Sequence, residues 1–197
     1  LHIDADYRLI EIPRDDFAPT VRRLIEELDG FNVTIPYKQD VMPLLDDIAP
    51  EARAIGAVNT VVKGERVCGH NTDILGFTAM LRHYHIDPAG QPCYVLGGGG
   101  TSKTACAALE RMGAQSVTVV SRRPGNGQID YTQLNEVFSG ILVNTTPAGM
   151  LYQKDPCPID EAALPGILER AKGVVDVIYN PPETVLTAAA KAAGVPA

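Results

Sequence analysis

The chain has 197 residues, 45% of them hydrophobic and 21% charged, a composition typical of folded globular proteins and too apolar for disorder. Lys and Arg number 17 against 24 Asp and Glu, giving a formal net charge of −7, which disfavours nucleic acid and anionic membranes as general partners. No apolar run is long enough for a membrane span, and the first residues do not resemble a signal peptide. We expect a cytoplasmic protein, because the cysteine spacing favours reduced thiols. Its four cysteines are too scattered to predict a disulfide framework or a metal site.

Short strand and helix patterns alternate in the first half. Apolar residues at helical spacing, among them Phe17, Val21 and Leu24, predict an amphipathic helix. The expected elements are a strand over 7–12, a helix over 15–28, a strand over 31–35, helical stretches at 41–45 and 50–54, a hairpin of 57–62 with 65–68, and a helix from 73 that ends before Pro88.

The second half alternates more regularly. Strands are expected at 93–96, 116–120, 141–143 and 174–178, with intervening helices that include 101–112 and 184–193. This alternation predicts an α/β protein with parallel sheets and crossover helices. We expect two lobes, over residues 1–76 and 77–197, and the composition of segment 88–92, with Gly90 inside it, is typical of a joint between the halves.

A run of glycines follows the strand at 93–96 and precedes the helix at 101–112. Gly97 and Gly99 match the first two glycines of a dinucleotide-binding fingerprint, and Ser102 is a small third residue. Such a loop lets the backbone approach a pyrophosphate, and the helix N-terminus offers unpaired N–H groups. A flexible turn is the alternative, but the strand–loop–helix–strand unit favours a Rossmann-type nucleotide-binding lobe.

The end of the next strand predicts which nucleotide is bound. Sites for NAD usually carry an acidic residue there, whereas this chain has Ser121, Arg122, Arg123 and Pro124. Paired guanidinium groups suit a 2′-phosphate through bidentate contacts, so NADP is favoured over NAD. Two solvated arginines that close a strand are the alternative.

Polar residues also cluster in three segments of the first half. Lys38 follows a short strand, Asn59 opens another, and Asp73 stands at an expected helix start. A lysine beside a carboxylate can move the hydroxyl proton during oxidation of a secondary alcohol. Taken alone, Asp73 is equally compatible with a helix N-cap and Lys38 with a solvated surface lysine.

Together these segments resemble the shikimate dehydrogenase family over nearly the whole chain. The matching motifs, in the family's order, are 32–38 (NVTIPYK), 55–60 (IGAVNT), 69–76 (GHNTDILG), 97–102 (GGGGTS), 144–150 (NTTPAGM) and 176–181 (DVIYNP). The resemblance implies NADP-dependent interconversion of 3-dehydroshikimate and shikimate, in a cleft between a substrate-binding lobe and a Rossmann-type lobe, by a monomer or homodimer.

The resemblance also implies roles for individual residues. Lys38 and Asp73 occupy the positions of the family's catalytic pair, with the lysine as acid/base. Positions that match the family's substrate-binding residues are Thr34, Lys38, Asn59, Asp73 and Tyr179. Positions that match its cofactor-binding residues are Gly97, Gly98, Gly99, Gly100, Thr101, Ser121, Arg122, Arg123, Thr145 and Val177.

The chain departs from the family pattern at both ends. Family members open with a Ser-x-Ser motif that holds the substrate carboxylate and close with helices that bring a substrate-binding Gln, and the sequence shows neither segment. We therefore expect weak binding of the substrate carboxylate. Two alternatives stay open: a quinate/shikimate dehydrogenase that uses NAD, which Arg122 and Arg123 disfavour, and a non-catalytic NADP-binding fragment.

Overall fold

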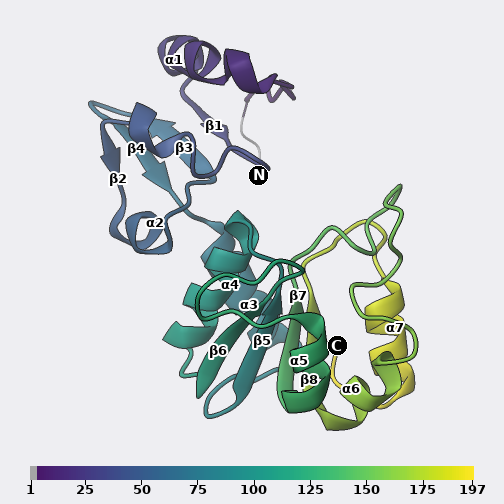
Figure 1. Ribbon diagram of the computed structural model, residues 1–197. Helices are drawn as coiled ribbons and strands as arrows, with labels where there is room; N and C mark the ends of the chain where they lie inside the picture. The colour runs from purple at the N-terminus through teal and green to yellow at the C-terminus, as the bar shows by residue number, and fades with distance from the viewer. Residues whose placement is uncertain (1–3) are drawn as a thin grey trace.

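Two β-sheets organise the molecule in the computed structural model, which describes residues 4–197 (Figure 1). The first sheet has the order β1-β3-β4-β2 and consists of β1 (Gly30–Asn32), β2 (Asp47–Ile48), β3 (Thr60–Lys63) and β4 (Val67–His70). The predicted hairpin is confirmed, because β3 and β4 pair antiparallel on either side of a turn at Gly64. The sheet is mixed: β1 also pairs antiparallel with β3, and β2 pairs parallel with β4.

The helices of the first lobe cover this mixed sheet. The predicted amphipathic helix is α1 (Phe17–Glu27), preceded by a 3₁₀ turn η1 (Arg14–Asp16), and it buries Phe17, Val21 and Leu24. Phe17 stacks on Tyr37 with ring centroids 4.1 Å apart. The other predicted helical stretches are a 3₁₀ turn η2 (Met42–Leu44) and α2 (Pro50–Ile55). The small core of this lobe therefore holds the turn that carries Lys38, the residue after Tyr37.

The strand expected over residues 7–12 is absent. That segment has no regular secondary structure, and Tyr7, Leu9 and Ile10 are exposed. Its apolar residues alternate as in a strand, but no described strand pairs with it. The alternation of apolar residues therefore predicted a strand wrongly, because the segment has no neighbouring strand among the described residues to pair with.

The second lobe confirms the predicted parallel α/β architecture. Its sheet has the order β6-β5-β7-β8, and every neighbouring pair is parallel. The strands are β5 (Pro92–Leu96), β6 (Ser116–Val120), β7 (Gly140–Asn144) and β8 (Ala171–Asp176). Because the strands are parallel, their carboxyl ends lie at one edge of the sheet, where the loop of residues 97–99, residues 121–123 and residues 177–179 all follow a strand.

Helices cover both faces of this sheet (Figure 1). On one face α3 (Asp73–His83) and α4 (Gly100–Arg111) pack their apolar sides against β5, β7 and β8. On the other face lie α5 (Tyr131–Val137), α6 (Leu164–Arg170) and α7 (Val185–Ala192). None of the helices within residues 4–197 is long and apolar enough to span a membrane.

The two lobes share part of one core. Ile55 and Ala57, from the first lobe, belong to the same buried cluster as Phe77 of α3 and Leu109 of α4. Segment 88–92 joins α3 to β5, and its Gly90 donates to the carbonyl of Gly113, so this segment lies inside the second lobe. The joint expected there from composition is therefore wrong.

Candidate active site

The turn after β1 positions Lys38. The Tyr37 amide donates to the carbonyl of Thr34 at 2.9 Å, and the Lys38 carbonyl accepts from the amide of Val58 at 2.8 Å. These bonds fix the backbone on both sides of the lysine, whose side chain is only 13% exposed. Lys38 is thus not a solvated surface lysine, which was one of the two alternatives that its position in the sequence allowed.

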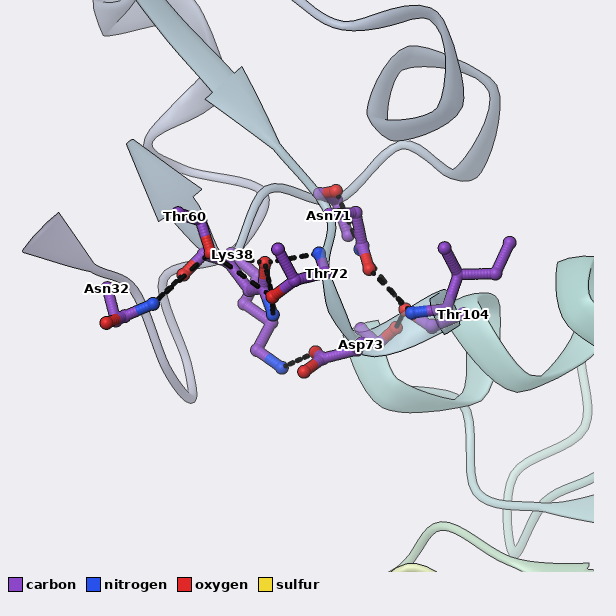
Figure 2. Close-up of polar contacts among 11 residues, drawn as sticks. Asn32, Lys38, Thr60, Asn71, Thr72, Asp73 and Thr104 are labelled. Carbon is purple, nitrogen blue, oxygen red and sulfur yellow. Dashed lines mark hydrogen bonds and ion pairs between the residues drawn. The ribbon is translucent and has the colours of Figure 1, made fainter. Parts of the chain in front are cut away.

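Asp73 meets this lysine from the other side of the site. The residue begins α3 directly after the hairpin, and its Oδ2 lies 2.6 Å from Lys38 Nζ (Figure 2). The N-cap position belongs to Thr72, so the carboxylate of Asp73 is not used to cap the helix. A carboxylate in the first turn is also favoured by the helix dipole. At 37% exposure, the Asp73 side chain remains accessible to a small molecule.

A polar network surrounds the pair, and sequence analysis identified only one of its members. The side chain of Asn59 is buried; its Nδ2 donates to Thr72 Oγ1 at 3.0 Å, and its Oδ1 accepts from the Thr72 amide at 2.9 Å. Thr60 Oγ1 donates to the same Oδ1, and Asn32 Nδ2 donates to Thr60 Oγ1 at 3.2 Å. The repeated Asn-Thr pairs at 59–60 and 71–72 were the available signal for this network.

The glycine loop reaches the same place from the second lobe. Gly97 has a φ of +104°, and a Cβ there would lie 3.1 Å from Thr145 Oγ1, so this position requires glycine. Around Gly98 and Gly99 an added Cβ would meet nothing within 4 Å, which leaves the backbone open to a ligand. At Gly100 the ideal Cβ position is 3.6 Å from Lys38 Cβ. Lys38 and the start of α4 are therefore in contact range.

These features fit a dinucleotide. The open backbone of Gly98 and Gly99 precedes the N-terminus of the twelve-residue helix α4, whose second residue is Thr101, and a pyrophosphate is favoured at such a position. Thr145 Oγ1 donates to the Leu96 carbonyl at 2.6 Å, which ties the loop after β7 to the end of β5.

The residues after β6 form an exposed cationic turn. Ser121 Oγ accepts from the Arg123 amide and donates to the Arg123 carbonyl, both at 3.2 Å. Arg122 and Arg123 are exposed, and neither forms an ion pair with a carboxylate of residues 4–197. Both guanidinium groups are therefore free to meet an anionic ligand.

The remaining predicted residues form no side-chain hydrogen bond with Lys38 or Asp73. Thr34 is exposed in the turn before Lys38, Val177 is half-buried after β8, and Tyr179 is 87% exposed. Asp176, the last residue of β8, holds the loop that follows: its carboxylate accepts from Thr184 Oγ1 at 2.8 Å and from Asn144 Nδ2 at 3.1 Å. Burial raises the pKa of Asp176, an effect that these hydrogen bonds partly offset.

Comparison with known proteins agrees with this geometry. A family model described as the shikimate dehydrogenase substrate binding domain matches residues 1–61. A shikimate dehydrogenase (NADP(+)) of Clostridium beijerinckii is 35% identical over 93% of this chain and 71% of its own length. That of Caldanaerobacter subterraneus is 37% identical over 85% of this chain and 65% of its own.

Solved structures give the same result. A chorismate mutase/shikimate 5-dehydrogenase fusion protein of Clostridium acetobutylicum superposes with a TM-score of 0.89 at 33% identity, covering 98% of this chain and 74% of that one. Shikimate 5-dehydrogenase of Thermus thermophilus, solved in complex with NADP(H) and shikimate, gives 0.77 at 30% identity over 93% and 71%. On the sequence identity and the share of each chain that is covered, this chain belongs to the shikimate dehydrogenase family.

Proposed function

We propose that the chain catalyses the reversible, NADPH-dependent reduction of 3-dehydroshikimate to shikimate, with Lys38 as the acid/base. The observation that carries the proposal is the 2.6 Å contact between Lys38 Nζ and Asp73 Oδ2, beside the first residue of α4. Both relatives described above are NADP-dependent shikimate dehydrogenases by name. The family and the geometry therefore support the same reaction.

Lys38 handles the proton in this proposal. NADPH, when bound, supplies the hydride that converts the ring ketone to a secondary alcohol. As the carbonyl oxygen gains electron density, the Lys38 ammonium donates a proton to it, and in the reverse direction the neutral amine accepts the hydroxyl proton. The Asp73 carboxylate holds Nζ in place and accepts a hydrogen bond from a substrate hydroxyl.

The neighbouring polar groups orient the substrate. Asn59 Nδ2 carries two N–H groups, and the structure engages one of them with Thr72, which leaves one for a hydroxyl of the polyol. Thr34 and Tyr179 are assigned to the same role by their positions in the family motifs. Uncharged donors of this kind select a polyol by its pattern of hydroxyl groups.

The second lobe holds the cofactor. We assign the pyrophosphate to the backbone of residues 97–101, the 2′-phosphate to Ser121, Arg122 and Arg123, and the nicotinamide half to Thr145 and Val177. The open backbone at Gly98 and Gly99 and the exposed, unpaired guanidinium groups support the first two assignments. The third rests on the motif positions alone.

The test is NADPH formation from shikimate and NADP⁺ by the wild-type chain, by Lys38→Met and by Lys172→Met, which makes the same substitution at an exposed lysine of β8. Turnover by the wild type and by Lys172→Met, together with its loss in Lys38→Met, supports the proposal. If the wild type binds NADP⁺ and all three proteins are equally inert, the chain is a cofactor-binding fragment.

Parallel assays with NAD⁺ and with quinate separate the remaining alternative. A quinate dehydrogenase of Corynebacterium glutamicum, solved in complex with NAD, superposes with a TM-score of 0.77 at 28% identity. We expect turnover to be fastest with NADP⁺ and shikimate, because an uncompensated pair of arginines favours the 2′-phosphate. Faster turnover with NAD⁺ and quinate would contradict this choice.

A further inference from the structure

A single buried side chain, Asn71, lies between the catalytic pair and the cofactor loop. It follows the last residue of β4 and precedes Asp73 by two positions, and it is 2% exposed. Its Nδ2 donates to the Ala57 carbonyl at 3.0 Å and to Thr104 Oγ1 at 3.3 Å, while its Oδ1 accepts from the Ile74 amide at 3.3 Å. Both N–H groups of the amide are thus used, one in each lobe.

Thr104 connects Asn71 to the cofactor loop through a second hydrogen bond. It lies in the second turn of α4, is also 2% exposed, and its Oγ1 donates to the Gly100 carbonyl at 3.3 Å. Gly100 begins α4 and lies in contact range of Lys38. Asn71 and Thr104 meet as Figure 2 shows, and one chain of hydrogen bonds therefore runs from the residues before Asp73 to Gly100, the first residue of α4.

The same amide also fixes the elements that carry Lys38 and Asp73. The Ala57 carbonyl that it binds lies one residue before Val58, whose amide holds the Lys38 carbonyl. The Ile74 amide belongs to the first turn of α3, directly after Asp73. Asn71 is thus bonded to the residue before Val58 and to the residue after Asp73, next to the attachment of each member of the pair.

A second hydrogen bond between the lobes differs in one important respect. Lys103 Nζ donates to Gln39 Oε1 at 3.1 Å, but both residues are exposed, so water can replace either partner. Asn71 and Thr104 lie among the apolar residues of the shared core, where an unpaired polar group has no such substitute. The buried bond is therefore the one that fixes the geometry.

We propose that Asn71 and Thr104 are positioning residues for the reaction: their hydrogen bond holds the Lys38–Asp73 pair at a fixed distance from the cofactor loop. This inference rests on the proposed function, because only a reaction shared between the lobes requires that distance. Neither residue touches the reacting atoms. Their effect on the rate comes from holding the proton donor and the hydride donor in register.

The experiment compares Thr104→Val, which keeps the shape but removes the hydroxyl, with Thr104→Ser, which restores it. Thr78→Val is the matched control: it changes a half-buried helical threonine of α3 whose hydroxyl has no hydrogen-bond partner within residues 4–197. We expect Thr104→Val to lower kcat about tenfold or more, since small misplacements of reacting groups are costly, with KM for shikimate and NADP⁺ within about threefold. Thr104→Ser and Thr78→Val should keep kcat near the wild-type value.

Hydrogen exchange of the ligand-free proteins gives a readout that does not depend on turnover. Thr104→Val should exchange faster than the wild type in segments 98–104 and 71–76, and Thr104→Ser and Thr78→Val should not. Wild-type kcat and wild-type exchange in Thr104→Val would overturn the inference, as would equal losses in Thr104→Ser and Thr104→Val. An inert wild type would refute the proposed function and with it the role of both residues in the reaction, whereas the exchange comparison would still decide whether the hydrogen bond holds the two segments together.

Discussion

Replacing Lys38 with methionine removes the proposed proton donor and keeps most of its stem. General acid–base catalysis contributes about 10²- to 10⁴-fold, so kcat for shikimate oxidation should fall by that factor. The KM for NADP⁺ should change little, because the cofactor is assigned to the second lobe. Folding should be affected only modestly: methionine keeps most of the apolar stem of the lysine, whose side chain is 13% exposed, and water can solvate the Asp73 carboxylate, which is 37% exposed.

The assay is NADPH absorbance in steady state, with thermal unfolding of the same preparations. Lys172→Met controls for the loss of a lysine elsewhere on the molecule. The reasoning is refuted if Lys38→Met retains more than about a hundredth of wild-type kcat, since that residue would then supply less than general acid–base catalysis provides. A large fall in melting temperature that accounts for the lost activity would refute it as well.

Three further outcomes are expected. Replacing Arg122 and Arg123 with glutamine should raise KM for NADP⁺ about 10- to 100-fold, because charge-assisted hydrogen bonds to the 2′-phosphate are lost, and should leave KM for NAD⁺ unchanged. Equal increases in KM for both cofactors would contradict the 2′-phosphate assignment. Cys93 is fully buried, and its burial, with Cys106 nearby, raises its pKa to about 11, so at pH 8 about one thiol in a thousand is ionised. Peptide mapping after alkylation of the folded protein should therefore find Cys93 unmodified. Labelling of Cys93 as fast as that of Cys68 would refute this. Burial raises the pKa of Asp176, so as pH rises the unfolded chain releases this proton before the folded chain does, and the wild type loses stability over that interval. From acid to neutral pH, the melting temperature of the wild type should therefore fall relative to that of Asp176→Asn. A difference in melting temperature that stays constant with pH would contradict this.

Local patterns predicted most of the second lobe. The glycine run between a buried strand and a helix was sufficient to place the cofactor loop, because only a parallel strand–helix unit puts such a loop at the sheet edge. The start of α3 at Asp73 was also predicted, from apolar residues at helical spacing such as Ile74 and Phe77. Both features depend on neighbours in the sequence, which is why the sequence revealed them.

Features that depend on long-range pairing were missed or predicted wrongly. The segment around Leu9 alternates as a strand does, but strand formation requires a partner that local pattern does not reveal. In the first lobe the hairpin was predicted, but the parallel pairing of β2 with β4, which makes the sheet mixed, was not. Asn71 and Thr104 are separated by 33 positions, and nothing in their local sequence signals that they meet.

The most direct measurement is a ternary crystal structure of this chain with NADP⁺ and shikimate. We predict that Lys38 Nζ lies within hydrogen-bonding distance of the substrate hydroxyl that is oxidised, about 2.6–3.2 Å, with the nicotinamide facing the carbon that bears it. A complex in which shikimate binds away from Lys38 and Asp73, or in which that hydroxyl meets only solvent, would contradict the account.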